Sequence, residues 1–246
     1  MSIKIAIPSH NRTNITTLEL LSEFPREDIY IFVNDEEQRN KYKEVHKFLN
    51  VIQSNTKGIQ QARNYILDFF GNDTEVLMLD DDIEKFLTLE GGVKNFKIQK
   101  KLNEMTNTQV KEFVEKGFEV ARKNNVKLWG IYPVENPFYM SAKLDNKGFI
   151  IGSFSGIIVD DIRMDNNLQL KEDYDYTLQH IIKNKKVMRY NNYTMKIKHY
   201  SNAGGVVDLR NEKQDMEQRC CDYLLKKYPF FLKANPKREN ELLISL

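Results

Sequence analysis

The 246-residue sequence predicts an α/β protein built on a doubly wound, mostly parallel sheet. In its first half, short apolar runs alternate with stretches of helical character, which is the order of successive βαβ units. One amphipathic helix is marked by apolar residues three and four positions apart, at Ile59, Ala62, Ile66 and Phe69. The apolar run 76–79 leads directly into three aspartates, and such sheets bind ligands at the carboxyl ends of their strands.

The elements of the first half follow from these patterns. Strands are expected at 3–7, 29–33, 51–52 and 76–79, and helices at 16–24, 36–49 and 58–70. Pro8 closes the first strand, and Asn34-Asp35 closes the second.

The second half is less regular. Segment 90–107 is polar, contains Gly91-Gly92 and several lysines and lacks a hydrophobic period, so we predict a mobile loop there. Beyond it we expect helices at 109–124, 173–183 and 211–227, strands at 127–134, 148–159, 187–190 and 195–199, and a glycine-containing loop at 201–206. No repeat and no linker rich in Pro, Gly or Ser divides the chain, so a single domain over 1–246 is predicted.

Composition excludes few classes of protein. The net charge of +2 neither indicates nor excludes nucleic-acid binding, because a basic face can exist within a balanced total. No apolar run approaches the ~20 residues of a membrane-spanning helix, and the first residues do not form a secretory signal. Cys220 and Cys221 are adjacent, which gives no disulfide framework and favours a cytoplasmic location.

The acidic run Asp80-Asp81-Asp82 is the strongest candidate site. Alternation along an extended chain would point Asp80 and Asp82 to one side and Asp81 to the other. Three adjacent carboxylates repel one another unless a cation offsets their charge, and oxygen ligands suit Mg²⁺ or Mn²⁺. The alternative is a solvated acidic turn. The sequence lacks GxxxxGK[ST] and has no GxGxxG after its first strand, so metal and side chains, rather than a glycine-rich loop, are expected to hold any phosphates.

Five segments, in this order, resemble the GT-A glycosyltransferases: IAIPSHNR (5–12), FVND (32–35), KGIQQARN (57–64), LMLDDD (77–82) and KEDYDYTLQHI (171–181). The resemblance covers roughly residues 1–200. It implies a GT-A-like (Rossmann-like) mixed sheet, with a nucleotide-sugar-binding half at about 1–90 and an acceptor half at about 109–246. It also implies a UDP-sugar as donor.

The resemblance assigns donor-binding roles to residues of the first half. Pro8, Ser9 and Arg12 would border the uracil and ribose, although Pro8-Ser9 also fits a simple strand end with a helix cap. Asp35 would approach the base or ribose. Gly58 and Arg63 match a stretch near the nucleotide, although a helical arginine is more often a partner in a salt bridge.

The resemblance also implies a metal site. Asp80 and Asp82 match the DXD motif, with Asp82 on the metal, Asp80 nearer the ribose and Asp81 in support. His199 in KIKHYSNAGG is the candidate third ligand, with a structural histidine as the alternative.

An aspartate at the start of a later helix is the general base in inverting members of this fold. Asp173 matches it best, with Glu172 as its neighbour. Acids at a helix start also complement the helix dipole without any catalytic role. In a retaining enzyme, Asp173 would only orient the acceptor.

For the acceptor, the overall pattern resembles phage enzymes related to the TET-associated glycosyltransferases, which modify hydroxymethylated pyrimidines in DNA or extend a sugar already there. Lysines in 94–101 and 183–189 would contact phosphates, or they are solvated faces of a lysine-rich protein. A modified base would have to leave the stack to reach the donor. Candidate aromatic residues for such a pocket are Tyr132, Phe138, Tyr139 and Phe154, with Ser155 and Gly156 allowing close approach.

Two other functions stay open. One is transfer to a saccharide or cell-envelope glycan, a class in which a membrane anchor is usual. The other is a non-catalytic nucleotide-sugar-binding or DNA-binding protein, which would have little use for Asp80, Asp82 and Asp173 together. The sequence does not indicate an oligomeric state.

Overall fold

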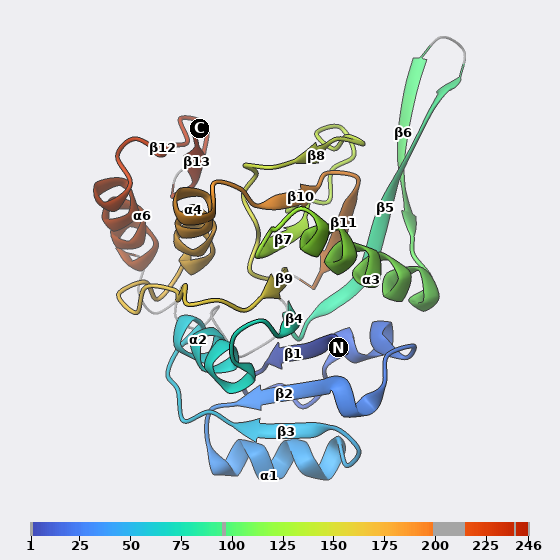
Figure 1. Ribbon diagram of the computed structural model, residues 1–246, viewed down its shortest axis with the longest axis vertical. Coiled ribbons are helices and arrows are strands. Elements are labelled where there is room, and N and C mark those ends of the chain that lie inside the picture. Colours follow the sequence, from blue (N-terminus) through green and yellow to red (C-terminus); the bar gives the residue numbers. More distant parts are fainter. Residues whose placement is uncertain (1, 95–96, 199–214, 239, 246) are drawn as a thin grey trace.

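An eight-stranded sheet runs through the middle of the protein (Figure 1). The computed structural model describes residues 2–94, 97–198, 215–238 and 240–245. In spatial order the strands are β3 (Asn50–Gln53), β2 (Ile29–Val33), β1 (Lys4–Pro8), β4 (Glu75–Leu79), β9 (Phe154–Ile158), β7 (Leu128–Ile131), β10 (Met188–Tyr190) and β8 (Leu144–Asp145).

Strand direction decides which chain segments meet at each edge of this sheet. β3, β2, β1 and β4 are parallel. β9 runs antiparallel to both β4 and β7, and β10 is parallel to β7. The carboxyl ends of β1, β2, β4, β7 and β10 therefore lie along one edge. The predicted mixed, mostly parallel sheet is confirmed.

Two cores, one on each face, show that the sheet is doubly wound. Ile5 and Ile7 of β1 belong to a cluster with residues of α3 (Asn107–Lys123), whereas Ala6 between them joins α2 (Ile59–Phe70) and α4 (Glu172–Asn184). This alternation is what a strand buried on both faces produces. A third cluster packs α6 (Asp215–Lys227) against Leu178 of α4. The remaining helix, α1 (Glu36–Val45), lies at the β3 end of the sheet (Figure 1).

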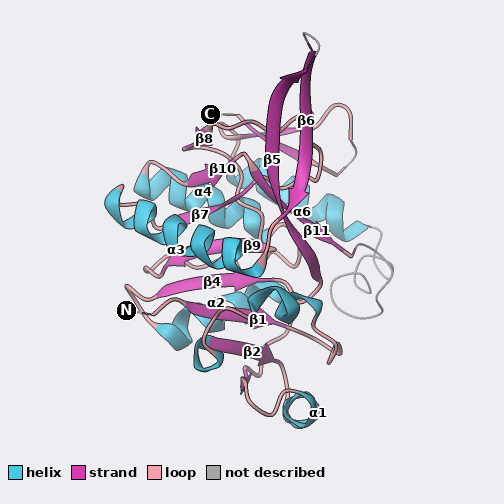
Figure 2. Cartoon of the chain, turned by 90° about the vertical axis from the view of Figure 1, so that its right-hand side faces the viewer, coloured by secondary structure: helices cyan, strands magenta, loops and turns pink. Residues whose placement is uncertain are grey.

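The prediction of a mobile loop at 90–107 is wrong. β5 (Ile83–Lys94) and β6 (Lys97–Glu104) form an antiparallel hairpin, and β11 (Tyr193–Ile197) pairs with β5 to make a three-stranded sheet. The hairpin stands away from the body of the protein in both ribbon views (Figures 1 and 2). Its base contributes to the core through residues such as Phe86 and Leu87. Farther out, Glu90, Lys100 and Lys101 are exposed, and the segment lacks the alternating pattern that a buried face imposes on a strand.

Other boundaries differ in smaller ways. The strand expected at 148–159 is limited to β9, and 16–24 forms a short 3₁₀ helix, Thr16–Leu21. A second 3₁₀ turn, Arg26–Asp28, and a two-stranded sheet of β12 (Leu232–Ala234) and β13 (Leu242–Ile244) were not expected. The predicted loop at 201–206 and His199 lie outside the described residues.

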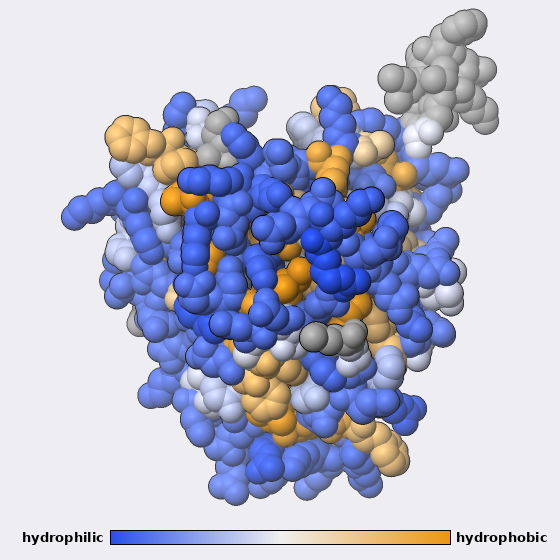
Figure 3. Space-filling model, viewed as in Figure 1, coloured by the Kyte–Doolittle hydropathy of each residue, from blue (hydrophilic) through white to orange (hydrophobic). Residues whose placement is uncertain are grey.

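The surface and the cysteines agree with the composition. Hydrophilic residues cover most of the face in Figure 3. Cys220 and Cys221 are free, buried thiols on α6. None of the helices in the described part of the chain is long and apolar enough to cross a membrane.

Candidate functional site

The three aspartates lie where the chain leaves β4 and turns toward β5. The backbone N–H of Asp80 donates to the carbonyl of Ser153 at 3.1 Å, and its carbonyl accepts from Thr17 Oγ1 at 2.6 Å. Thr17 Oγ1 also accepts from the backbone N–H of Ile83 at 3.0 Å. The turn is therefore held at both ends by hydrogen bonds, which fixes the position of the acids.

Arg63 connects this turn to the start of α4. Its guanidinium is 3% exposed and donates to Asp80 Oδ1 at 2.8 Å and to Glu172 Oε1 at 2.5 Å. Asp80 Oδ2 accepts from Ser153 Oγ at 2.6 Å. A buried cation requires close carboxylate partners, since an unpaired one would be strongly destabilising. Arg63 thus joins the acid predicted for the donor side with the helix predicted to carry the base.

Gly152 makes room for this arginine. A Cβ atom at position 152 would lie 2.0 Å from Arg63 Nη1, a contact that no side chain can make. The backbone N–H of Gly152 also donates to Asp173 Oδ2 at 3.2 Å. A glycine is needed at this position for the guanidinium to occupy its place, and its backbone N–H helps to hold Asp173.

A second arginine holds the other two aspartates. Arg12 Nη1 donates to Asp81 Oδ1 at 3.0 Å and to Asp82 Oδ2 at 3.1 Å. Asp81 is buried and also accepts from Ser9 Oγ at 2.5 Å. The Tyr42 hydroxyl bonds to Ser9 Oγ at 2.7 Å and accepts from the Arg12 backbone N–H at 2.8 Å. The loop after Pro8 and the acidic run are therefore one hydrogen-bonded unit.

This arrangement corrects the predicted alternation. Asp81 and Asp82 converge on Arg12, whereas Asp80 bonds to Arg63 and Ser153. The reason is that the strand ends at Leu79 and the chain turns at Asp81 and Asp82, so extended-strand geometry no longer applies.

At the start of α4, Glu172 and Asp173 are in different surroundings. Glu172 is buried and paired with Arg63, whereas Asp173 is only half-buried. Asp173 accepts from the backbone N–H groups of Gly152 and Tyr174, the latter at 2.9 Å. Burial raises the pKa of both carboxyls, against the opposing effect of the Arg63 charge. Asp173 is the more accessible of the two, and its raised pKa strengthens it as a base.

The charges at this edge fit a divalent cation. Five carboxylates lie around two guanidinium groups, namely Asp80, Asp81, Asp82, Glu172 and Asp173 around Arg12 and Arg63. Burial, with Asp80 and Asp81 close by, raises the pKa of Asp82 to about 6, as expected where negative charge is in excess.

The described residues do not form a complete set of metal ligands. Within the described ranges, no three His, Cys, Asp or Glu side chains are arranged to hold a metal ion. The third predicted ligand, His199, lies outside those ranges. Mg²⁺ is commonly held by one or two carboxylates together with water and substrate phosphates, so Asp80 and Asp82 fit such a site without a closed cage.

Two further predicted residues have clear local roles. Asp35, at the carboxyl end of β2, caps α1 by accepting from the Gln38 backbone N–H at 2.8 Å. That bond holds the pKa of Asp35 below its usual value. Gly58 begins α2 at φ +87°, a conformation that favours glycine. Their predicted contacts with a nucleotide remain predictions.

Sequence reasoning missed Thr17, Tyr42 and Ser153, which position the acids, because their partners lie tens of residues away. A buried tyrosine in the otherwise polar helix α1 is the one signal that the sequence offered.

The expectations for the β9 stretch were wrong. Phe154 is fully buried and does not line an acceptor pocket. A Cβ at Gly156 would lie 2.0 Å from the Trp129 ring, so this glycine accommodates that indole rather than a substrate.

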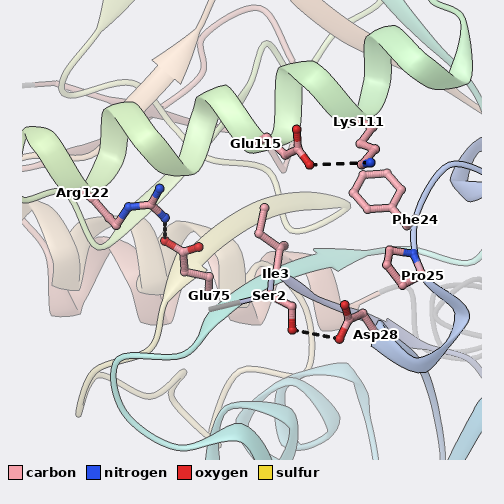
Figure 4. Close-up of a pocket in the computed structure, with 9 residues that line it drawn as sticks. All are labelled: Ser2, Ile3, Phe24, Pro25, Asp28, Glu75, Lys111, Glu115 and Arg122. Atoms are coloured by element: carbon pink, nitrogen blue, oxygen red, sulfur yellow. Dashed lines mark hydrogen bonds and ion pairs between the residues drawn. The ribbon is translucent and has the colours of Figure 1, made fainter.

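Two cavities in the described part of the structure lie away from the aspartates. One, of about 290 Å³, lies at the opposite edge of the sheet, where Ile3 and Glu75 stand at the amino ends of β1 and β4 (Figure 4). Its charged residues are paired, as in the Arg122–Glu75 contact. The other, of about 550 Å³, lies beside β8 and β10. Neither is lined by the acidic run.

Comparison with known proteins gives the class and then the family. A family model matches residues 3–205, which is most of the chain. The match identifies a glycosyltransferase, an enzyme that transfers a sugar from a donor to an acceptor. The chain belongs to the TET-associated glycosyltransferase family.

Two solved structures show a distant likeness. A cytidylyltransferase from Leptospira borgpetersenii serovar Hardjo-bovis (strain JB197) is 12% identical over 93% of this chain and 95% of its own, with a TM-score of 0.46. CMP:2-keto-3-deoxy-manno-octonic acid synthetase complexed with CTP is 6% identical over 89% of this chain and 100% of its own, also at 0.46. Such scores carry no argument about activity. No curated protein matches the chain in sequence.

Proposed function

We propose that this enzyme transfers a sugar from a UDP-sugar to a hydroxyl of a hydroxymethylated, or already glucosylated, pyrimidine in phage DNA, in the cytoplasm of the host. The observation that carries the proposal is the Arg63 bridge between Asp80 and Glu172. It brings the acids suited to a metal–diphosphate group next to the helix that bears the candidate base.

The donor is proposed to bind at the carboxyl edge of β1, β2 and β4. Pro8, Ser9 and Arg12 border this position, and the Arg12 guanidinium lies beside the acids. Mn²⁺ or Mg²⁺ held by Asp80 and Asp82, with His199 as a third ligand, would act as a Lewis acid on the diphosphate leaving group. The hydrogen bond from Arg63 orients Asp80 for that role.

Asp173 is proposed to remove the acceptor proton. In an inverting transfer, its carboxylate takes the proton from the acceptor hydroxyl as the oxygen bonds to the anomeric carbon. The bond from that carbon to the diphosphate breaks, and its electron pair leaves with UDP. Glu172 remains paired with Arg63. It positions the guanidinium and takes no part in the proton transfer.

The choice of DNA as acceptor is supported by family membership and by the basic segments of the sequence. A base in a duplex would have to leave the stack to reach Asp173.

The proposal is tested by incubating the protein with UDP-glucose and Mn²⁺ together with plain, hydroxymethylated or glucosylated DNA. Incorporation of sugar only into a modified DNA is the expected result. No incorporation into any DNA, combined with transfer to a saccharide, would overturn the DNA acceptor and leave the general activity in place.

A further inference from the structure

We propose that the β5–β6 hairpin and the loop after β7 form the surface that contacts acceptor DNA. Residues 91–94 and 97–103 of this hairpin are called the arm, and residues 132–143 are called the ring loop. The inference rests on the proposed DNA acceptor and assigns it to a part of the molecule.

The arm is continuous with the candidate site. β5 begins at Ile83, the residue after Asp82, and the Ile83 backbone N–H is bonded to the same Thr17 hydroxyl that holds Asp80. A strand of this length reaches roughly 40 Å, about one turn of B-form DNA. Both ribbon views show the hairpin extending outward from the body (Figures 1 and 2). DNA lying along it would lead toward the acidic edge.

The charge of the arm is of one sign. Its sequence contains Lys94, Lys97, Lys100 and Lys101 and no acidic residue. The strand register places Lys94 opposite Lys97, so lysines flank both sides of the tip. Sequence-independent affinity for DNA comes from lysine and arginine contacts with phosphates, and an uninterrupted positive strip is suited to it.

Two of the acids near the base of the hairpin are paired with lysines outside the arm. Glu104 is paired with Lys85 at 2.5 Å, and Glu84 with Lys196 at 3.2 Å. Glu90 accepts from Asn103 at 2.6 Å and keeps its negative charge opposite Lys101, so the net positive charge of the arm lies mainly toward its outer end.

The other basic segment of the sequence is a poorer candidate. Lys183 is paired with Asp161, and Arg189 is half-buried beside Asp145 at 3.1 Å. Lys186 donates to the carbonyl of Asn124. Asp161 and Asp145 therefore offset the charges of Lys183 and Arg189 in this segment.

The ring loop starts from the same edge of the sheet as the acidic run. β4 and β7 both pair with β9, and Leu77 and Trp129 both lie opposite Gly156. Tyr132 is therefore level with Asp80, two strand spacings or roughly 10 Å away.

Two aromatic side chains of the ring loop are left in solvent. Phe138 is 77% exposed and Tyr139 is 63% exposed, and their rings meet edge to face with centroids 5.0 Å apart. Exposed aromatic rings stack on nucleic-acid bases of any sequence.

Lys100 joins the two parts. Its Nζ atom donates to the carbonyl of Phe138 at 3.2 Å and to that of Met140 at 2.7 Å. The arm thus holds the ring loop in place, so that phosphate-binding charge and base-stacking rings act on one ligand. We assign the arm to the DNA backbone and the ring pair to an unstacked base.

The first test neutralises the arm while sparing the tether at Lys100. The full-length K94S/K97S/K101S variant is compared with K41S/K116S/K237S, which removes three exposed lysines elsewhere. The probe is a fluorescein-labelled duplex of about 20 base pairs, two helical turns, with one unpaired pyrimidine at its centre. The arm variant should bind at least ~10-fold more weakly. The slope of the logarithm of its affinity against the logarithm of the salt concentration should be smaller by about two to three. The control triple should bind as the wild type does.

The second test removes the rings. F138A/Y139A is compared with F48A/F230A, which deletes two other rings of high exposure, 77% and 87%. The ring-loop variant should lose about 10-fold in affinity for the duplex with the unpaired base and little for the fully paired duplex. The control double variant should retain the wild-type preference.

Three outcomes would overturn the inference: arm-variant binding within twofold of wild type, an equal loss in the control triple, or an unchanged preference in the ring-loop variant. UDP binding with Mn²⁺ serves as the folding control, since neither surface includes a residue that is proposed to bind the donor. If the wild type modifies DNA and the arm variant does so equally, only the assignment of the DNA-binding surface is contradicted. If DNA binds through the arm but no DNA accepts a sugar, only the proposed function is contradicted.

Discussion

Arg63 is the residue on which the candidate site depends most directly. Its buried guanidinium bonds to Asp80 from the first half of the chain and to Glu172 from the second. Removing one member of such a buried group leaves an uncompensated charge, at a cost of about 3–5 kcal/mol. Substitution of Arg63 would therefore test folding as much as function. Smaller substitutions at neighbouring residues report on the function of the site more specifically.

Gly152→Ala is one such change. The added methyl group would displace Arg63 Nη1, which lies 2.0 Å from the Cβ position, and should weaken Mn²⁺-dependent UDP binding by at least ~10-fold, about 1.4 kcal/mol. Gly91→Ala is the matched control, because nothing lies within 4 Å of its Cβ position. Calorimetric titration with UDP measures the effect. Equal affinities in the two variants would contradict the role given to Gly152.

Asp173→Asn keeps the shape of the side chain and removes its basicity. We expect UDP binding within about twofold of wild type and transfer slower by about 10²–10⁴-fold, the usual contribution of a general base. Steady-state transfer rates measured beside UDP titrations separate the two effects. Wild-type rates in the variant would show that Asp173 is not the base. Its role would then be limited to the hydrogen bonds that it accepts from Gly152 and Tyr174.

At the scale of single residues, the sequence indicates the acidic residues of the site more clearly than the residues that bind them. The run at residues 80–82 and the acids at 172–173 stand out because they follow an apolar strand and begin a helix. The pairing of Arg63 with Glu172 spans 109 residues and depends on a glycine at 152. No local pattern encodes such contacts.

At the scale of elements, α4 carries the candidate base Asp173 in its first turn, and several of the residues that follow are buried. Asp175 accepts from Tyr228 Oη and from Lys227 Nζ, both at 2.7 Å, which fixes α6 against it. One turn further on, His180 is buried, and burial lowers its pKa to about 4 despite the nearby Asp160. In the described part of the chain its Nε2 has no hydrogen-bond partner.

This histidine predicts a pH-dependent stability. Because the folded-state pKa lies below the unfolded value of about 6.5, the stabilisation is complete above that pH and is lost as pH falls toward 4. Between pH 7 and 5 the loss attributable to His180 should be about 2 kcal/mol. Urea unfolding at both pH values should show a smaller loss in His180→Gln than in wild type. The same loss in both proteins would contradict the assignment.

The hairpin shows where element prediction fails. β5 and β6 are held together by backbone pairing from Leu87 to Lys94, and Phe86 and Leu87 at their base pack on the core. Strands that are identifiable from sequence bury one face or both, as Ile5, Ala6 and Ile7 of β1 do. Where neither face is buried, the pattern resembles that of a loop.

At the scale of the whole molecule, the mixed sheet collects the site at one edge. Parallel β1, β2 and β4 end there, and antiparallel β9 brings Ser153 to Asp80 from the other direction. The order of apolar runs predicts the first part of this architecture. The position of β9 between β4 and β7 requires strand pairing over long separations and has no counterpart in local sequence.

Donor binding should depend on a metal. UDP affinity in the presence of Mn²⁺ should fall by at least ~10-fold, about 1.4 kcal/mol, on addition of a chelator or in Asp82→Ala. Asp145→Ala is the control for removal of a carboxylate away from the acidic run, beside Arg189. Isothermal titration in the three proteins gives the comparison. Affinity unaffected by the chelator would exclude the proposed metal role of Asp80 and Asp82.

Mass spectrometry of nucleosides tests the proposed transfer to DNA. DNA that contains hydroxymethylated or glucosylated pyrimidines is exposed to the enzyme with a panel of nucleotide-sugars and Mn²⁺, then digested. A sugar mass should be added to the modified pyrimidine with wild-type protein and none with Asp173→Asn. Unchanged nucleosides, with the donor sugar recovered on a saccharide instead, would contradict the proposed transfer.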